Sequence, residues 1–385
     1  MEEISSPLEP GAIYRSTLNR AAIEYAETYL EGLADHPAYK HPENDVSELY
    51  RFPVSEHPLP LNQVLKLLSK NVDSLGVNSP SQGNLAYIPG GALYHSTIGD
   101  YLAAVTNRYA GHFYGSPGAV HMENMLLGWM AELVGYPPQA AGNLTSGGSI
   151  AQLIAFVTAR EAFGLLPQDF NRSVVYLTEQ SHHSIEKGLH IVGLGKTLRR
   201  IIPTDKHYRM AVNELEEVIK SDKKAGLLPW LIVATAGTTN TGAVDPLPQI
   251  GSIAKRHNAW YHIDGAYGAF FILCDLGKSI LQGIKDSDSL ILDPHKGLFL
   301  PYGSGAVLVK EAQHLKDAFA FQASYTQDAA ASPDVLSPSE LSPELSKHSR
   351  GLRLWLPLML VGTSPFAAAL EEKILLARYL HEQLG

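Results

Sequence analysis

The chain has 385 residues, of which 45% are hydrophobic and 18% charged, values typical of a globular protein with a sizeable core. A net charge of −9 argues against a surface that binds nucleic acid. The single cysteine, Cys274, excludes an intramolecular disulfide and a cysteine-based metal site, and it favours a reducing, cytoplasmic setting. No uncharged apolar run approaches the roughly 18 residues that a membrane span needs, so we expect no membrane partner. The acidic N-terminus lacks the apolar region of a secretory signal.

Residues 1–85 predict a helical segment that cannot form a core alone. Apolar side chains recur at helical spacing after Ser16 or Thr17, the candidate N-caps, and a second helix is expected over residues 61–68. This amphipathic pattern predicts that the segment packs on the large domain or on a dimer partner. The recurring positions are Leu18, Ala22, Tyr25, Tyr29 and Leu33.

The large domain is expected over residues 86–320, because apolar strand patterns alternate there with helical patterns. This rhythm predicts an α/β fold with a mostly parallel central sheet covered by helices on both faces. Residues 321–345, rich in Ser, Ala, Asp and Pro, predict a long mobile loop, and residues 346–385 predict the start of another domain. The expected strands are 174–177, 198–202, 231–235, 260–263, 289–292 and 306–309.

Four of these strands are followed by side chains that can take part in catalysis or binding. His182, Thr238, Asp264 and Lys296 each come just after a strand, and parallel strands bring their carboxyl ends to one edge of the sheet. Taken singly, Lys296 could be a surface lysine, Asp264 a turn residue and His182 a loop histidine bonded to backbone. Their coincidence favours a common site, in which Thr239 is an alternative to its neighbour Thr238.

A glycine-rich turn, Ser-Gly-Gly-Ser at 146–149, stands at the start of a predicted helix. The backbone N–H groups of Gly147 and Gly148, the Ser149 hydroxyl and the helix dipole together predict a phosphate site. The turn is neither a Walker A loop nor a G-x-G-x-x-G fingerprint, so a nucleotide-binding protein is a remote alternative. The adjacent pair His182 and His183 lacks the carboxylates or cysteines that would complete a zinc site, so we expect no metal.

A phosphate site, an aldehyde-capturing lysine and a carboxylate are the groups that pyridoxal 5′-phosphate (PLP) requires. Asp264 would keep the pyridine nitrogen protonated, so that the ring accepts the electrons of a carbanion. The imidazole of His182 would stack on the ring, and the small side chain of Ala266 would let the other face lie close.

Six spaced motifs between residues 86 and 358 resemble the group II PLP-dependent amino-acid decarboxylases. This family includes the aromatic-L-amino-acid, histidine, tyrosine and glutamate decarboxylases. The motifs are TSGGSIAQL (145–153), SHHSIEKG (181–188), ATAGTTNTGAVD (234–245), HIDGAYG (262–268), DPHKG (293–297) and ELSKHSRGLRLW (344–355).

The resemblance implies a fold-type I architecture and a homodimer whose active sites lie near the subunit interface. It implies Lys296 as the Schiff-base lysine, with His295 as its neighbour in the site. Gly148, Ser149 and Ser289 would hold the phosphate, and Thr238 would lie near the cofactor's substituents.

The activity implied by the resemblance is decarboxylation of an L-amino acid, with aromatic substrates as candidates. The amine and carbon dioxide would form through a Lys296 Schiff base and a quinonoid intermediate. Tyr325 falls where the family carries a loop tyrosine thought to protonate that intermediate, which favours decarboxylation over oxidative aldehyde formation. Tyr87 and Ile88 fall where the family lines its substrate pocket.

Three alternatives remain open from the sequence. They are an aldehyde synthase, a carbon–carbon lyase of the same fold, and a homologue that binds PLP but is catalytically silent. The last is suggested because the family usually continues after Trp355 into a small C-terminal domain, which is expected to be incomplete in this chain.

Overall fold

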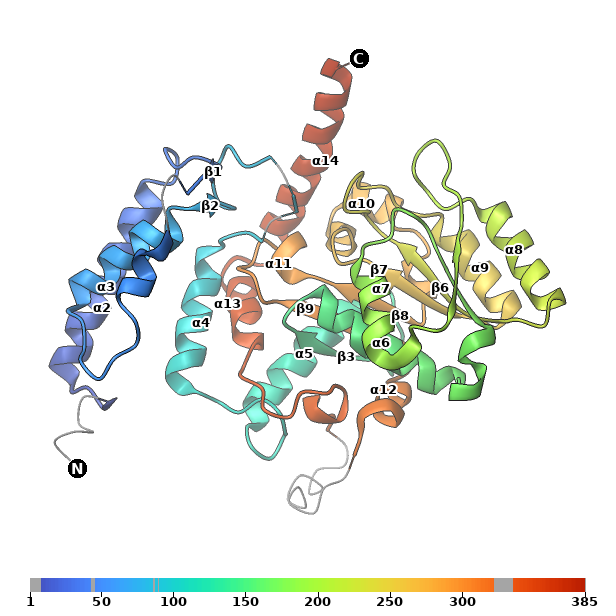
Figure 1. Ribbon diagram of the computed structural model, residues 1–385, viewed down its shortest axis with the longest axis horizontal. Coiled ribbons are helices and arrows are strands. Elements are labelled where there is room, and N and C mark those ends of the chain that lie inside the picture. Colours follow the sequence, from blue (N-terminus) through green and yellow to red (C-terminus); the bar gives the residue numbers. More distant parts are fainter. Residues whose placement is uncertain (1–7, 43–45, 86, 89, 322–334, 385) are drawn as a thin grey trace. The chain divides into compact units, whose positions relative to one another are not determined.

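The computed structural model describes residues 8–42, 46–85, 87–88, 90–321 and 335–384, with residues 46–48 described by their backbone alone. Contacts within the chain divide it into two compact units, residues 1–89 and residues 90–385 (Figure 1).

The described residues of the N-terminal unit form two α-helices and a short two-stranded ribbon. Helix α2 runs over Ala12–Glu31 and begins after Gly11, earlier than the predicted caps, because nothing in its first turn breaks a helix. Helix α3 covers Leu61–Leu68, as predicted. Strands β1 (Tyr39–Lys40) and β2 (Gly76–Val77) pair antiparallel, and the remaining turns are η2 (Val46–Arg51) and η3 (Ser69–Asp73).

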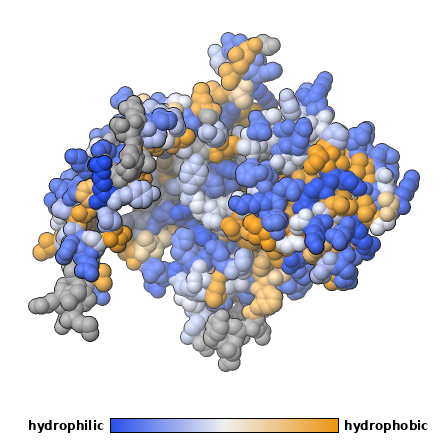
Figure 2. Space-filling view, viewed as in Figure 1, coloured by the Kyte–Doolittle hydropathy of each residue, from blue (hydrophilic) through white to orange (hydrophobic). Residues whose placement is uncertain are grey.

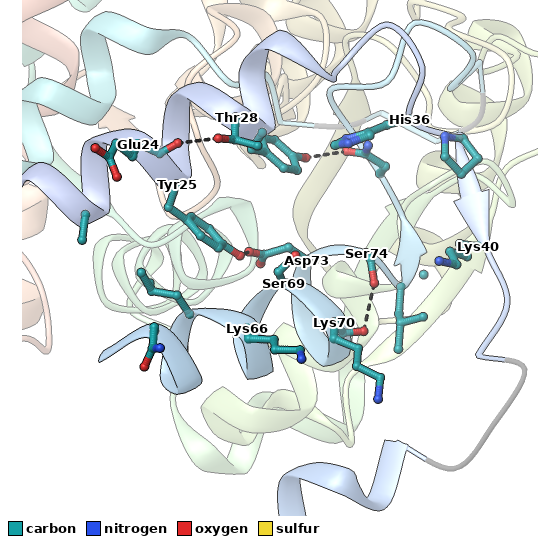
Figure 3. Close-up of a pocket in the computed structure, with 18 of the residues that line it drawn as sticks. Glu24, Tyr25, Thr28, His36, Lys40, Lys66, Ser69, Lys70, Asp73 and Ser74 are labelled. Carbon is teal, nitrogen blue, oxygen red and sulfur yellow. Dashed lines mark hydrogen bonds between the residues drawn. The ribbon is translucent and has the colours of Figure 1, made fainter. Parts of the chain in front are cut away.

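Side-chain hydrogen bonds join residues that line a cavity of about 1160 Å³ within this unit. The hydroxyl of Tyr25 donates to the carboxylate of Asp73, and the hydroxyl of Tyr29 donates to Oδ1 of Asn78 at 2.8 Å. Figure 3 shows Tyr25 pointing from α2 across the cavity toward Asp73. Partial burial, followed by the bond to Asp73, raises the pKa of Tyr25 to about 12. These bonds tie α2 to the turn η3 that follows α3 and to Asn78, the residue after β2.

The larger unit is organised around a seven-stranded sheet of order β3-β9-β8-β7-β6-β4-β5. Strands β8, β7, β6, β4 and β5 pair in parallel, whereas β9 runs antiparallel to both of its neighbours. Strand β3 therefore has the same direction as β8, and the predicted mostly parallel sheet is confirmed. The strands are β3 (Ala141–Thr145), β4 (Ser173–Leu177), β5 (Leu198–Ile201), β6 (Leu228–Thr235), β7 (Trp260–Asp264), β8 (Ser289–Leu292) and β9 (Gly305–Val309).

Helices cover both faces of this sheet (Figure 1). Alternate residues of β4 belong to different hydrophobic clusters: Val174 and Tyr176 lie in one, Val175 and Leu177 in the other. The first cluster receives side chains from α5 (Pro117–Leu133), α8 (Val212–Lys224), α9 (Leu247–His257), α13 (Gly351–Val361) and α14 (Ser364–Leu384). The second receives them from α6 (Gly148–Phe163), α7 (Ser184–Leu189) and α12 (Ala312–Phe319).

Helix α4 and several shorter elements complete the described part of the larger unit. They are α4 (Tyr94–Thr106), η4 (Pro167–Arg172), η5 (His190–Leu194), η6 (Ala269–Leu273), α10 (Asp275–Ile280), η7 (Ile284–Asp286), α11 (Pro294–Gly297) and η9 (Pro338–Glu340). The four-residue helix α11 is the element that carries Lys296.

The C-terminal helices α13 and α14 start within the core of the larger unit, where Leu354, Leu358, Phe366 and Leu370 are buried. Figure 2 shows both apolar and polar side chains at the far end of α14, beyond this buried start. No described helix is by itself long and apolar enough to cross a membrane, although α13 and α14, which meet at 94°, satisfy the length and composition criteria as a bent pair.

Candidate active site

A cavity of about 260 Å³ lies at the edge of the sheet where β3, β4, β6, β7 and β8 have their carboxyl ends. This is the edge that the strand order predicts for a binding crevice. Its lining consists of residues 146–150, His182, Ser184, Thr235, Gly237, Thr239, Asp264, Ala266, Tyr267, Ile291, Asp293, His295 and Lys296. The cavity therefore brings together most of the residues proposed from the sequence.

The glycine turn between β3 and α6 forms one wall. Gly147 has φ +153° and ψ 174°, a conformation that only glycine adopts readily, and its N–H donates to Oγ1 of Thr145 at 3.3 Å. Helix α6 begins at Gly148. The first N–H groups of a helix have no acceptor within it, so Gly148 and Ser149 offer donors at the cavity wall.

Asp264 ends β7 and is 5% exposed. Its Oδ2 accepts a hydrogen bond from Nε2 of Gln152 at 3.0 Å, and its Oδ1 accepts one from the N–H of Ala266 at 3.2 Å. Burial raises the pKa of Asp264, while the Ala266 N–H, the positive charges of Lys296 and His182, and Gln152 act in the opposite direction. The donors favour the charged form of a carboxylate that has little contact with water.

His182 follows β4 and lines the cavity, whereas its neighbour His183 does not. Its Nδ1 accepts hydrogen bonds from the Ser184 hydroxyl at 2.7 Å and from the Ser184 N–H at 3.2 Å. Both bonds favour the tautomer that carries its proton on Nε2. Burial lowers the pKa of His182, so the ring is predominantly neutral at neutral pH.

Lys296 stands at the other wall, with 22% of its side chain exposed. Its Nζ lies 3.3 Å from Oδ2 of Asp293. His295 is buried, and its Nδ1 donates to the carbonyl oxygen of Ser304 at 2.5 Å, which leaves Nε2 facing Asp293 at 3.7 Å. The lysine is thus held at the cavity by a charged partner while part of its side chain remains accessible.

Of the two threonines that follow β6, Thr239 lines the cavity and not Thr238, which the sequence had favoured. Thr239 lines the cavity, whereas Thr238 is 1% exposed and its Oγ1 is hydrogen bonded to Oγ1 of Thr241 at 2.6 Å. The N–H of Ala243 also donates to Oγ1 of Thr238. The hydroxyl of Thr238 is used within its own turn, and we replace it with Thr239 as the candidate.

Ser289 does not reach the cavity, so its assignment as a phosphate contact is corrected as well. It is the first residue of β8, at the amino end of the strand, while the cavity lies at the carboxyl end. Its buried Oγ accepts from Nε1 of Trp260 at 2.9 Å and contacts Nδ1 of His262 at 2.8 Å. Ser289 therefore supports packing between β7 and β8, and we withdraw it from the phosphate contacts.

Three proposed residues stay predictions. Tyr325 lies outside the described residues. Tyr87 and Ile88 belong to the N-terminal unit, where Tyr87 is 81% exposed and has φ 64°.

Sequence reasoning missed several residues that line the cavity, and it missed Gln152, which lies behind Asp264. Asp293 is the N-cap residue of α11 and precedes Lys296 by three residues, a spacing that brings their side chains together, and Gln152 follows Gly148 by one helical turn. These spacings were signals that could have identified both residues. Ser184, Thr235 and Tyr267 carried no such signal.

The arrangement fits PLP. Unpaired donors at the start of α6, the Ser149 hydroxyl, a buried carboxylate with two hydrogen-bond donors, a neutral imidazole and an accessible lysine share one cavity. Thr235 Oγ1 and Asp293 Oδ1 are buried without a hydrogen-bond partner among the described residues. Such orphaned polar atoms are expected where a ligand completes a site.

Comparison with known proteins gives a consistent result. Residues 42–385 match the model of the pyridoxal-dependent decarboxylase conserved domain. The chain is 35% identical over 324 residues to an aromatic-L-amino-acid decarboxylase from Bacillus atrophaeus, covering 84% of this chain and 67% of that one. It is 25% identical over 368 residues to a phenylacetaldehyde synthase from Arabidopsis thaliana, covering 92% and 75%. In other curated decarboxylases, the match covers as little as 63% of the relative's length.

Among solved structures, mouse CSAD superimposes with a TM-score of 0.86 and 26% identity. The superposition covers 97% of this chain and 79% of that one. The fold of the chain is therefore that of this group of proteins.

Proposed function

Because this chain belongs to the pyridoxal-dependent decarboxylase family, we propose that it removes the α-carboxylate of an L-amino acid and releases carbon dioxide and the amine. The observation that carries the proposal is the meeting of Lys296, Asp264 and the start of α6 in one cavity. Aromatic L-amino acids are the proposed substrate class, supported by the 35% identity to the Bacillus atrophaeus enzyme.

When bound, PLP supplies a ring that accepts the electrons left behind by the departing carboxylate. Gly148 and Ser149 would hold its phosphate through backbone N–H groups and the serine hydroxyl. Asp264 would keep a negative charge beside the ring nitrogen, because Gln152 and Ala266 donate to its two oxygens.

The remaining side chains would act around the ring and the substrate. His182 would cover the ring as a neutral imidazole, which adds no positive charge beside the protonated nitrogen. Lys296 would provide the amine Nζ that binds the cofactor and yields to the substrate amine. Thr239 would lie near the cofactor, and His295 would limit the space on the lysine side.

Carbon dioxide release from a panel of aromatic, acidic and aliphatic L-amino acids tests this function. Lys296→Ala should abolish release, while Lys220→Ala, which changes an exposed lysine on α8, should leave it unchanged. Borohydride reduction of the cofactor-loaded protein should leave a phosphopyridoxyl group covalently attached to the peptide that contains Lys296, which mass spectrometry detects. If Lys296→Ala kept most of the wild-type rate, the assignment of Lys296 would be wrong.

Aldehyde formation is a second candidate, supported by the 25% identity to a phenylacetaldehyde synthase. We propose that Tyr325 donates a proton to the α-carbon and thereby directs the reaction to the amine. Measuring amine, aldehyde, ammonia and peroxide separates the two activities. Tyr325→Phe should shift the product toward aldehyde, and an unchanged amine yield would remove Tyr325 from the mechanism. Cofactor binding without any product would support a silent homologue.

A homodimer is the proposed assembly. No described side chain of α2 is buried within the chain, and Ile13, Tyr14 and Ile23 are exposed on it. Light scattering on the purified protein should give twice the chain mass of 41.9 kDa. A mass of one chain at micromolar concentration would contradict the dimer.

A further inference from the structure

The carboxylate of Asp293 faces the start of α6, where an anion would be expected. Asp293 lies between β8 and α11 and is 1% exposed. A Cβ atom added to Gly148 would lie 3.0 Å from Oδ2 of Asp293 and 3.4 Å from Oδ1. Oδ1 is buried and has no hydrogen-bond partner among the described residues. A side chain that carries negative charge thus lines the wall that offers N–H donors.

The charged groups around Asp293 come from two elements. On α11, Lys296 Nζ lies 3.3 Å and His295 Nε2 lies 3.7 Å from Oδ2. From the end of β7, Asp264 contributes a second negative charge. Helix α6 presents Gly148, which carries no side-chain charge. Before a ligand binds, Lys296 is the main partner that can balance the charge of Asp293.

A phosphate ester at the start of α6 would change this balance. Such a group carries between −1.5 and −2 charges at neutral pH, and two negative groups that share a site raise each other's pKa. If Lys296 binds the cofactor's aldehyde, its nitrogen must also turn toward that group. Burial already raises the pKa of Asp293, with Asp264 adding to the effect and Lys296 and His295 opposing it.

We propose that Asp293 takes up a proton from solvent when the phosphate group of PLP binds at the start of α6. The neutral carboxyl then donates a hydrogen bond to a phosphate oxygen through the oxygen atom that otherwise lacks a partner. The only bond formed on the protein in this step is the O–H bond of Asp293. The inference rests on the proposed cofactor use, and it makes Asp293 a phosphate-binding residue whose affinity depends on pH.

Two consequences follow. In the proposal, the Asp293 carboxyl is neutral in the complex with PLP and ionised in the free protein. The affinity for PLP should therefore fall by about tenfold per pH unit as the pH rises from the pKa of Asp293 in the free protein to its pKa in the complex. Asp293→Asn keeps a hydrogen-bond donor of nearly the same shape but has no proton to lose. The variant should therefore bind PLP with a dissociation constant that lacks this part of the pH dependence.

The experiment measures the dissociation constant of PLP for cofactor-free wild-type protein and Asp293→Asn between pH 6 and pH 8. Pyridoxal, which carries the aldehyde but no phosphate, is titrated in parallel, so that the reaction of Lys296 with the aldehyde is common to both series. Asp288→Asn is the control variant. Asp288 is a half-buried carboxylate at the amino end of β8, with a pKa also raised by burial, and it does not line the cavity.

For PLP, the ratio of the wild-type to the Asp293→Asn dissociation constant should rise at least about tenfold from pH 6 to pH 8. The corresponding ratio should stay flat for pyridoxal and for Asp288→Asn. A rise of less than about threefold, or an equal rise with pyridoxal, overturns the proposal. Failure of the wild type to bind PLP at any pH would instead refute the proposed cofactor use.

A measurement on the wild type alone keeps the proposal falsifiable if Asp293→Asn does not fold. Calorimetric titration at pH 8 in two buffers of different ionisation enthalpy gives the protons taken up on binding. PLP should take up about one proton more than pyridoxal does, because the free phosphate ester, with a second pKa of about 6, is already fully ionised at this pH. Equal proton counts for the two ligands overturn the proposal.

Discussion

Gln152 donates a hydrogen bond to Oδ2 of Asp264 at 3.0 Å, and it does so from the helix whose first residue, Gly148, lines the same cavity. Gln152 is fully buried. Helix α6 therefore connects both ends of the proposed cofactor site: its N-terminus offers donors to a phosphate, and its second turn orients the carboxylate.

Gln152→Leu should shift the acidic limb of the activity profile to higher pH. The lost donor favours the charged form of Asp264, so its removal raises the pKa of a carboxyl whose pKa burial already raises. A hydrogen bond to a charged group contributes about 1.5–3 kcal/mol, which corresponds to about one to two pH units. The pH dependence of kcat, and of the absorbance of the bound cofactor, measures the shift.

The control for this change is Gln249→Leu, which makes the same replacement on the exposed side of α9. It should leave both profiles unchanged. An unshifted profile in Gln152→Leu, in a protein that still binds the cofactor, would show that Gln152 only fills space beside Asp264.

Gly147→Ala should weaken PLP binding by about tenfold or more. The φ of +153° and ψ of 174° lie in a region used almost only by glycine, and forcing another residue into it costs about 1–3 kcal/mol. The added Cβ would also lie 3.3 Å from Cε1 of His295. The turn would relax and move the N–H donors of α6, which a dissociation constant for PLP reports.

Gly164→Ala is the matched control at the other end of α6, where φ is +67° and no atom lies within 4 Å of an added Cβ. It should lower the thermal midpoint through strain of about 1–2 kcal/mol without changing the affinity for PLP. Equal losses of affinity in both variants would mean that helix stability, and not the turn geometry, controls binding.

Thr239→Val and Thr238→Val should have opposite signatures. Thr239 lines the cavity, so loss of its hydroxyl should weaken cofactor binding or raise KM by about threefold to tenfold. Thr238 is bonded within its turn to Thr241 and Ala243, so its replacement should lower the thermal midpoint and leave binding nearly unchanged. The reverse result would restore the assignment made from the sequence.

Much of the fold was predictable because the sheet obeys a simple periodicity. The six predicted strands all appear, and five of them are short, largely apolar runs that are buried. The sixth, β5, is a partly exposed edge strand with the sequence Leu-Arg-Arg-Ile. Strand β3 was missed because its sequence, Ala-Gly-Asn-Leu-Thr, has few residues that favour strands. It is held instead by five pairings with β9, a long-range contact that no local pattern reveals.

The site was predictable to the level of strand ends and no further. The rule for parallel sheets correctly brought His182, Asp264 and Lys296 to one edge. It could not decide which of two adjacent threonines faces inward, because that depends on the turn that binds Thr238. Ser289 was assigned from the family resemblance and not from this rule, which argues against it, because Ser289 occupies the amino end of β8.

The buried ion pair between Lys347 and Glu123 predicts a large effect on stability away from the cavity. Both side chains are 0% exposed, and Nζ of Lys347 lies 2.8 Å from Oε2 of Glu123 and donates to Oδ1 of Asn143 at 2.8 Å. Asn143 in turn donates to the carbonyl oxygen of Pro338 at 2.8 Å. These bonds attach the segment before α13 to α5 and β3.

Lys347→Met should lower stability by about 3–5 kcal/mol, because it leaves the charge of Glu123 buried without a partner. The double variant Lys347→Met with Glu123→Leu should recover most of that loss, since it removes both charges and fills the space with apolar groups. Lys373→Met, which breaks an exposed pair with Glu372, should change stability by less than about 1 kcal/mol. Thermal and urea unfolding of the four proteins measures the series. If the single and double variants were equally unstable, the loss would come from packing or from the bond to Asn143, and not from the unpaired carboxylate.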